Sequence, residues 1–290
     1  MRQLVKQIYL ILLYAAQIRD WHFYKFPYLN IYKGKKAFIM SNGPSLRNTL
    51  KDYDEGKVFL DEHSFWVNLG PLDEHFYTIK PHHLCFSDPM FIRDYEPQKT
   101  QVRKMYEMLN ERVDWDLTIY GCFWKADEHE QLRQYSGITN PNIKFVRMNR
   151  KYCNDLTPKL RYALYKKGYF MVPDSTIANT AIFIALIEGY SEIEVYGCDH
   201  NQFLELAVNE KNQMCMRDTH FFDSKELDLR PIYKPYGDYA VWRVHEYMGF
   251  CWGMFCSHEM LRKFADYLGV RILNCTPGSM IDSYERKSGC

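Results

Sequence analysis

The stretch KAFIMSNGPSL (residues 36–46) decides how this chain of 290 residues is interpreted. Its first five residues, Lys36 to Met40, form a short apolar run typical of a buried strand. The polar residues that follow, Ser41 to Ser45, include Gly43 and Pro44, which favour a loop that leads into a helix. A glycine in such a loop lets backbone amides approach an anion such as phosphate.

The same loop excludes two common nucleotide-binding classes. It lacks the Gly-Lys-Ser/Thr ending of a P-loop, and it contains no G-x-G-x-x-G pattern. Neither a P-loop ATPase nor a dinucleotide-dependent dehydrogenase is therefore supported.

Further apolar runs repeat along the chain and alternate with helical segments. Two helices are expected at residues 180–188 and 257–268, because Gly189 and Gly269 follow them as end signals. This alternation predicts an α/β fold with a doubly wound, mostly parallel, Rossmann-like sheet. The other expected strands cover residues 64–68, 83–88, 116–121, 142–146, 192–197 and 270–274.

We expect the chain to divide into two parts. Residues 1–33 form an N-terminal amphipathic and aromatic helical segment, and residues 34–290 form the α/β domain. Within that domain, residues 201–250 interrupt the strand-helix rhythm with a polar, aromatic stretch. Such a stretch predicts a lid subdomain inserted before the last strand.

Composition limits the classes of partner. Lys and Arg total 37 against 36 Asp and Glu, a formal net charge of +1, so no basic field indicates a nucleic-acid partner. The nine cysteines form no C-x-x-C pair, and the ten histidines show no ligand spacing. We therefore expect free thiols in a reducing, cytoplasmic compartment, and no metal site.

The N-terminal segment contains the most apolar stretch, Leu4 to Ile18. Its uninterrupted apolar run, Ile8 to Ala16, is too short to span a membrane, which requires about 20 residues. Aromatic and basic residues follow over 21–36, as in a helix that lies in a membrane interface. We expect residues 1–33 to contact either the inner membrane face peripherally or a second copy of the chain. Ordinary packing and a signal peptide are the alternatives.

Small or polar residues occupy the ends of five expected strands. Because ligands of doubly wound sheets bind at the carboxyl ends of the strands, these positions together favour a cleft for a nucleotide or phosphate. The positions are Ser41–Ser45, Asn68, Asp88, Gly197–His200 and Thr276–Ser279.

Several of these segments resemble a known enzyme family. The NGPSL loop at 42–46 and the segment TIANTAIFIALIEGYSEIEVYGCD at 176–199 resemble bacterial sialyltransferases of the Campylobacter lipooligosaccharide type. The loop is also similar to one in the related motility-associated glycosyltransferases and in archaeal hydroxymethylpterin pyrophosphokinases. Shorter segments at 67–68, 86–89, 218–222 and 276–279 extend the resemblance over roughly residues 36–283.

The resemblance implies an inverting, metal-independent glycosyltransferase. It would move an acidic sugar, sialic acid or Kdo-like, from a CMP donor to a surface-glycan or lipid-linked acceptor, with no other cofactor. The chain departs from the family at His200 to Phe203, which contain no tyrosine, and at 222–224, where the family has its catalytic histidine. A cytidine-type donor is therefore better supported than sialic acid itself.

The residues expected to contact the donor nucleotide lie at strand ends or at a helix start. For Thr176 and Asn179, a plain helix cap is the alternative role. The expected set is Asn42, Gly43, Ser45, Asn68, Asp88, Thr176, Asn179, Gly197, Gly278 and Ser279.

Transfer requires a general base for the acceptor hydroxyl, and histidine titrates near neutrality without any tuning. The candidate catalytic residues are His220, which has Asp218 and Asp223 close in sequence, then His200 and Asp199. The departing phosphate requires hydrogen-bond donors or cations. The candidates for that role are Asn201, Arg217, Tyr233, Lys234 and Tyr236.

Two other functions stay open. A pterin pyrophosphokinase-like phosphotransferase would need Mg²⁺ and a pair of carboxylates, for which Asp88 and Asp199 are candidates. A catalytically silent nucleotide-binding partner in glycan assembly is favoured by the missing tyrosines.

Overall fold

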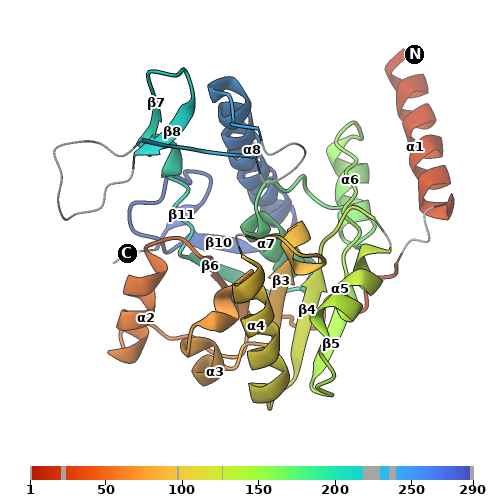
Figure 1. The fold of residues 1–290 in the computed structure, drawn as a ribbon. Coiled ribbons are helices and arrows are strands. Elements are labelled where there is room, and N and C mark those ends of the chain that lie inside the picture. The colour runs from red at the N-terminus through yellow and green to blue at the C-terminus, as the bar shows by residue number, and fades with distance from the viewer. Residues whose placement is uncertain are drawn as a thin grey trace.

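The computed structural model of the chain describes residues 2–20, 24–96, 98–125, 127–217, 229–234 and 240–287. Within these ranges, eight parallel strands form one sheet in the order β11-β10-β6-β1-β2-β3-β4-β5 (Figure 1). This arrangement confirms the expected parallel α/β sheet. The strands are β1 (Lys36–Met40), β2 (Ser64–Val67), β3 (His83–Phe86), β4 (Leu117–Gly121), β5 (Ile143–Arg147), β6 (Glu192–Tyr196), β10 (Arg271–Asn274) and β11 (Glu285–Arg286).

Helices cover both faces of the sheet, as a parallel sheet requires. Side chains of β1 alternate between two cores with the two-residue period of a strand, so that Ala37 and Ile39 face one and Phe38 and Met40 the other. Figure 1 shows one group of helices on each side. The first core contains α6 (Pro158–Tyr165), α7 (Ile177–Glu188) and α8 (Val244–Leu268), and the second contains α2 (Leu46–Asp54), α3 (His75–Ile79), α4 (Lys99–Arg112) and α5 (Glu128–Ser136).

Helix α7 is buried along its whole length. Its sequence is apolar on every face, which is typical of a helix enclosed by other elements, and it packs on β1, β2, β3 and α8. The helix begins at Ile177, three residues before the expected start, because Thr176 and Asn179 form a capping box there. Gly189 ends it with φ 92°, a left-handed conformation that glycine adopts without strain.

The strand order reverses direction next to β1. Strands β1 to β5 follow one another outward in one direction, whereas β6 pairs with the other side of β1 and begins the second half. A doubly wound sheet opens a crevice at such a reversal, outside the carboxyl ends of the two strands. In this chain the reversal lies between the loop after β1 and the loop after β6.

A separate three-stranded antiparallel sheet lies between β6 and α8 in the sequence, within the stretch expected to form a lid. Two expectations about the elements toward the C-terminal end were wrong. Helix α8 begins at Val244 rather than Ser257, because Glu246 accepts a hydrogen bond from the Arg243 amide and starts the helix early. The short β11 follows β10, so the strand near residue 270 is not the last. The small sheet contains β7 (Leu206–Val208), β8 (Met214–Arg217) and β9 (Leu229–Pro231). Elsewhere in the described residues the chain forms the 3₁₀ turns η1 (Gly70–Leu72), η2 (Pro89–Phe91) and η3 (Gln202–Glu205).

In the described part of the N-terminal segment the chain forms α1 (Arg2–Asp20), which lies beside α6 in Figure 1. It is attached through Leu10 and Tyr14, which are buried, and the Tyr14 ring meets Phe170 edge-on at 5.3 Å. Six other large apolar side chains among the described residues of the helix are exposed, and they are Val5, Ile8, Tyr9, Ile11, Leu12 and Leu13. Among the residues that the structure describes, no helix is both long and apolar enough to cross a bilayer.

Candidate functional site

The five polar strand ends expected to form a site lie on neighbouring strands. They follow β10, β6, β1, β2 and β3, which are consecutive in the sheet, and because all five strands are parallel their carboxyl ends share one edge. The structure therefore brings the predicted donor-binding segments together. The contacts that each segment makes at this edge distinguish their roles.

The glycine loop after β1 packs against the chain's own loop after β6. The Gly43 amide donates to the Gly197 carbonyl at 2.8 Å, and a Cβ on Gly43 would lie 2.0 Å from Asp199 Oδ2. Gly197 is equally confined, because a Cβ there would lie 2.2 Å from the Ser41 carbonyl oxygen. These two glycines are thus explained by close approach of two backbones, and not by the anion contact that we expected of Gly43 and Gly197.

Asp199 occupies the place at the start of α2 where an anion was expected. Its Oδ2 accepts hydrogen bonds from Ser45 Oγ at 2.8 Å and from the Ser45 amide at 3.4 Å. The N-terminal end of a helix stabilises a negative charge, and here a carboxylate of the same chain provides it. Ser45 and Asp199 are therefore committed to each other, which removes the Ser45 hydroxyl from the set free to bind phosphate.

Asn42, Asn68 and Asp88 form the polar part of the edge that remains open. Asn42 Nδ2 donates to the Val67 carbonyl at 3.1 Å, and Asn68 Nδ2 donates to Asp88 Oδ2 at 3.3 Å. Asn68 has φ 49°, a left-handed conformation that is uncommon for a residue with a side chain and is enriched at functional sites. Its Oδ1 atom is buried and has no hydrogen-bond partner among the described residues.

The Asp88 side chain is exposed to solvent and yet closely surrounded by protein. The surrounding protein removes part of its hydration and raises its pKa, an effect that the Arg150 cation and the Asn68 hydrogen bond oppose. A carboxyl with a raised pKa at the edge of the sheet where ligands bind is suited to proton transfer.

Arg150 and Asp174 form a buried ion pair at this edge that sequence reasoning missed. Arg150 Nε lies 3.1 Å from Asp174 Oδ1, and Tyr152 and Thr180 donate to the same carboxylate at 2.5 and 2.9 Å. The guanidinium also lies over the Trp124 ring, 4.5 Å from its centre. A charged residue soon after the expected strand at 142–146 was the available signal, but its partner is 24 residues away.

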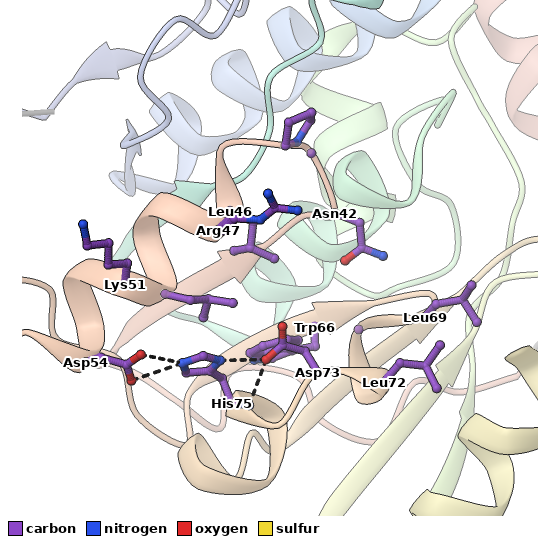
Figure 2. A pocket seen from close by; sticks show the side chains of 14 residues that line it. Asn42, Leu46, Arg47, Lys51, Asp54, Trp66, Leu69, Leu72, Asp73 and His75 are labelled. Atoms are coloured by element: carbon purple, nitrogen blue, oxygen red, sulfur yellow. Dashed lines mark hydrogen bonds and ion pairs between the residues drawn. The ribbon is translucent and has the colours of Figure 1, made fainter. Parts of the chain in front are cut away.

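A cavity of about 610 Å³ opens beside the glycine loop and runs along α2 (Figure 2). Asn42 and Gly43 lie at one end, and the cations Arg47 and Lys51 line it from α2. The remaining lining residues come from the glycine loop, α2, β2, the segment after β2 and α3, and they are Pro44, Leu46, Leu50, Asp54, Trp66, Leu69, Gly70, Leu72, Asp73 and His75.

A histidine between two carboxylates closes the far end of this cavity (Figure 2). His75 Nδ1 lies 2.7 Å from Asp73 Oδ1, and His75 Nε2 lies 3.0 Å from Asp54 Oδ2. Burial lowers the pKa of His75, but the hydrogen bonds to the two carboxylates outweigh this effect and raise it overall. Sequence reasoning did not find this group, because its three members lie on α2, on α3 and between them.

The loop after β10 holds the edge together internally. Ser279 Oγ donates to the Cys198 carbonyl at 2.7 Å and accepts from Asn274 Nδ2 and from the Ile281 amide, each at 3.2 Å. These bonds use the capacity of the hydroxyl, so a donor contact through it is not supported. Gly278, with φ 70°, is an exposed turn residue.

Thr176 and Asn179 take the alternative role of helix cap. The Thr176 amide and hydroxyl both lie within hydrogen-bond distance of Asn179 Oδ1, at 3.2 and 3.1 Å. Asn179 Nδ2 is buried and has no partner among the described residues, so one amide group at this helix start remains unsatisfied.

His200 faces away from solvent and toward α8. Its Nε2 lies 3.0 Å from His258 Nε2 and 3.4 Å from Cys198 Sγ, and burial lowers its pKa to about 4. Proton transfer is most efficient when the pKa of the base lies near the working pH. The position of His200 therefore does not support the role of general base.

The remaining candidate residues belong to the lid stretch. His220 and Tyr236 lie outside the described residues, and Arg217 is the last residue of β8. Lys234 Nζ pairs with Glu246 Oε1 at 2.7 Å, so that its charge is already neutralised. Tyr233 is exposed, and Asn201 precedes η3.

Comparison of the chain with protein-family models, with curated proteins and with solved structures finds no match in any of the three.

Proposed function

We propose that this chain is a glycosyltransferase that takes an acidic sugar from a CMP donor bound at the carboxyl edge of β1, β2 and β3. The observation that carries the proposal is the meeting of Asn42, Asn68 and Asp88 at that edge, beside the reversal of strand order. Doubly wound sheets bind nucleotides at this place. The adjoining cavity of about 610 Å³ is within the usual range for a small-molecule site.

The polar groups of this edge suit the parts of a nucleotide. Asn68 has a buried Oδ1 without a partner, which can accept a hydrogen bond from a ribose hydroxyl or from the base. Arg47 is exposed at the cavity and makes no ion pair with the other described residues, so its guanidinium is available for a phosphate. These assignments move the phosphate contact from Ser45 to the cavity side of α2.

The proposed reaction inverts the sugar carbon in one displacement. The acceptor oxygen forms a bond to the anomeric carbon, the bond from that carbon to the donor phosphate breaks, and CMP departs with the electron pair. The acceptor proton passes to a general base. Asp88 is the described carboxylate best placed for this role, and His220 is the base expected from the sequence.

The geometry of the two candidate carboxylates does not favour a Mg²⁺-dependent phosphotransferase. Asp199 follows β6 and is held by Ser45, whereas Asp88 follows β3 and is held by Asn68. Strands β1 and β2 lie between β6 and β3, a separation of roughly 14 Å at the usual strand spacing. One Mg²⁺ ion cannot bind both carboxylates across that distance.

We also propose that the protein lies in the cytoplasm, peripherally bound at the inner face of the membrane, and that its acceptor is a surface glycan or a lipid-linked glycan. This location is supported by the exposed apolar face of α1 and by the eight described cysteines, which are all free. Free thiols suit a reducing compartment. The same apolar face could instead join two copies of the chain.

Calorimetric titration with CMP, UDP, GDP and ATP tests the donor. We expect CMP to bind tightest, and tighter binding of UDP would overturn the CMP assignment. A CMP-sugar incubated without divalent metal should release CMP. If CMP binds but no CMP is released with any acceptor, the chain is a catalytically silent binding partner.

The substitution Asn68→Ala tests the site within the same titration. Loss of one ligand hydrogen bond should weaken CMP binding about tenfold, the equivalent of about 1.4 kcal/mol. The matched control is Asn154→Ala, which changes an exposed asparagine in the loop before α6 and should leave CMP affinity unchanged. Equal affinity in both variants would place the nucleotide elsewhere.

A further inference from the structure

Three buried side chains with metal-ligating atoms converge behind the loop after β6. Cys198 and His200 come from that loop, and His258 comes from the middle of α8. The Cys198 Sγ and one ring nitrogen of each histidine lie within 4.8 Å of one another. The three residues are 1%, 9% and 0% exposed, so the cluster is a buried feature of the fold and not a surface coincidence.

The distances between these atoms fit a tetrahedral ion. His200 Nε2 lies 3.0 Å from His258 Nε2 and 3.4 Å from Cys198 Sγ. Tetrahedral Zn²⁺ with ordinary bond lengths places two nitrogens about 3.3 Å apart and a nitrogen and a sulfur about 3.6 Å apart. Small side-chain shifts would therefore complete the geometry.

The surroundings hold the ligands in the orientation that a metal needs. His258 Nδ1 lies 2.9 Å from the Tyr284 hydroxyl, and a partner of this kind fixes which nitrogen of a metal-binding histidine faces the ion. His200 has φ 51°, a left-handed conformation that brings its ring next to Cys198. A strained backbone of this kind persists where surrounding structure requires it.

We propose that Cys198, His200 and His258 bind one divalent ion of the zinc class. One thiolate with two imidazoles is a ligand set that borderline-soft ions prefer. Binding releases the Cys198 thiol proton to solvent, and a water molecule or an external ligand fills the fourth position. The ion would fasten the loop that carries Asp199 to α8 and, through His258, to Tyr284. The proposal does not depend on glycosyl transfer, since it uses none of the groups assigned to the donor.

The histidines are 58 residues apart in sequence, which is why no ligand spacing was visible there. An ion bound by these residues would contradict the expectation that the chain has no metal site.

Cobalt(II) reports thiolate coordination directly. The full chain, stripped with a chelator, is titrated with Co²⁺ and then with Zn²⁺. We expect a thiolate-to-cobalt charge-transfer band in the near ultraviolet that saturates at one equivalent and disappears when Zn²⁺ is added. Zn²⁺ should also raise the Tm of the wild-type chain, because an ion bound only by the folded state stabilises it.

Variants identify the ligands. Cys198→Ser should abolish the band, whereas Cys251→Ser, which alters another buried cysteine on α8, should retain it. Tyr284→Phe should retain the band but weaken binding by about ten- to a hundredfold, the usual effect of removing a partner of a ligating histidine.

Three outcomes would overturn the proposal: no saturable band in the wild-type chain, no rise of its Tm with Zn²⁺, or an unchanged band in Cys198→Ser. In each case the two imidazoles form only a hydrogen-bonded pair. If Cys198→Ser does not fold, the wild-type titration and Tyr284→Phe still decide the question.

Discussion

At the scale of single residues, Gly43 and Asp199 determine how the edge of the sheet is built. Gly43 lets the loop after β1 approach the loop after β6, and Asp199 then reaches the start of α2. The start of α2 is therefore already paired with a carboxylate from the loop after β6. Under the proposed function, a donor phosphate would therefore bind beside this loop, on the side of Asn42 and Arg47.

Gly43→Ala tests this packing. Its Cβ would lie 2.0 Å from Asp199 Oδ2 and 2.4 Å from the Gly197 carbonyl oxygen, so one backbone has to move. We expect the free energy of unfolding to fall by about 3 kcal/mol, the upper part of the range for overpacked sites. Urea denaturation measures it. In the control Gly249→Ala, a helical glycine with open space around it, stability should be unchanged or higher, and equal effects in both variants would contradict the packing argument.

The general base of the proposed transfer is either His220 or Asp88. His220→Ala should lower turnover at least about a hundredfold with little change in CMP affinity, the usual contribution of a general base. Asp88→Asn should lower CMP affinity or turnover by a smaller factor if Asp88 serves only the donor. Initial rates and calorimetry on both variants measure these effects. Full activity in His220→Ala together with a hundredfold loss in Asp88→Asn would assign the base to Asp88.

At the scale of elements, a buried polar network joins α7 to β3, to β4 and to His63, the residue before β2. Tyr120 donates to Glu188 Oε1 at 2.6 Å, and His83 lies between Tyr120 and Tyr190 at 3.2 and 2.9 Å. His63 Nδ1 lies 3.0 Å from the same Tyr190 hydroxyl. Burial raises the pKa of Glu188 well above its usual range and lowers that of His83 well below its own, so both side chains are neutral in the fold.

This network predicts a pH dependence of stability. Above about pH 4.5 the unfolded chain loses the Glu188 proton that the folded chain keeps, so the contribution of Glu188 to stability falls as pH rises. The neutral His83 acts in the opposite direction up to about pH 6.5, because the unfolded chain still binds a proton there that the folded chain does not. Glu188→Gln removes the Glu188 titration and should be more stable than wild type at pH 8, by about 1.4 kcal/mol or more, the free energy equivalent of one pKa unit. Near pH 5 the two should differ little.

Urea denaturation at pH 5 and pH 8 measures the effect of Glu188→Gln. The control Glu210→Gln alters an exposed glutamate and should follow the wild-type pH profile. Parallel profiles for wild type and Glu188→Gln would show that Glu188 ionises normally in the fold.

At the scale of the whole molecule, α1 extends the α/β domain with an apolar surface. Val5, Ile8, Tyr9 and Leu12 are between 49% and 64% exposed, whereas Leu10 and Tyr14 anchor the helix. A helix with exposed apolar side chains next to basic residues suits a membrane interface. None of the residues assigned to the proposed donor site belongs to α1, so membrane contact and donor binding can be tested with separate substitutions.

The double substitution Ile8→Gln with Leu12→Gln tests that surface. We expect at least about a tenfold loss of binding to vesicles that contain anionic lipid, because each side chain contributes about 1.5–3 kcal/mol when fully buried. Cosedimentation measures binding, and Phe59→Gln, which alters an exposed ring far from α1 in the sequence, is the control. If the wild type instead forms a dimer that the double substitution dissociates, the surface joins two copies. If the wild type neither binds vesicles nor forms a dimer, both roles of this surface are contradicted.

The sequence by itself determined the architecture of the sheet and the positions of its polar edge. Apolar runs of four or five residues and the glycines that end them are local signals, so β1 and β6 were expected within one residue of their observed ends. The start of α8 was missed because residues 244–256 contain two glycines and share the aromatic character of the stretch before them. Alternation of strands and helices then placed Asn68 and Asp88 at one edge without knowledge of any contact.

Only the tertiary structure decided what those edge residues contact. Ser45 meets Asp199 across 154 positions, Arg150 meets Asp174 across 24, and His200 meets His258 across 58. No local pattern encodes such pairs, because their energy comes from burial and hydrogen bonding between segments that the fold brings together. The polar character of a strand end can therefore be predicted from its own residues. Which side chains contact that strand end depends on the rest of the chain.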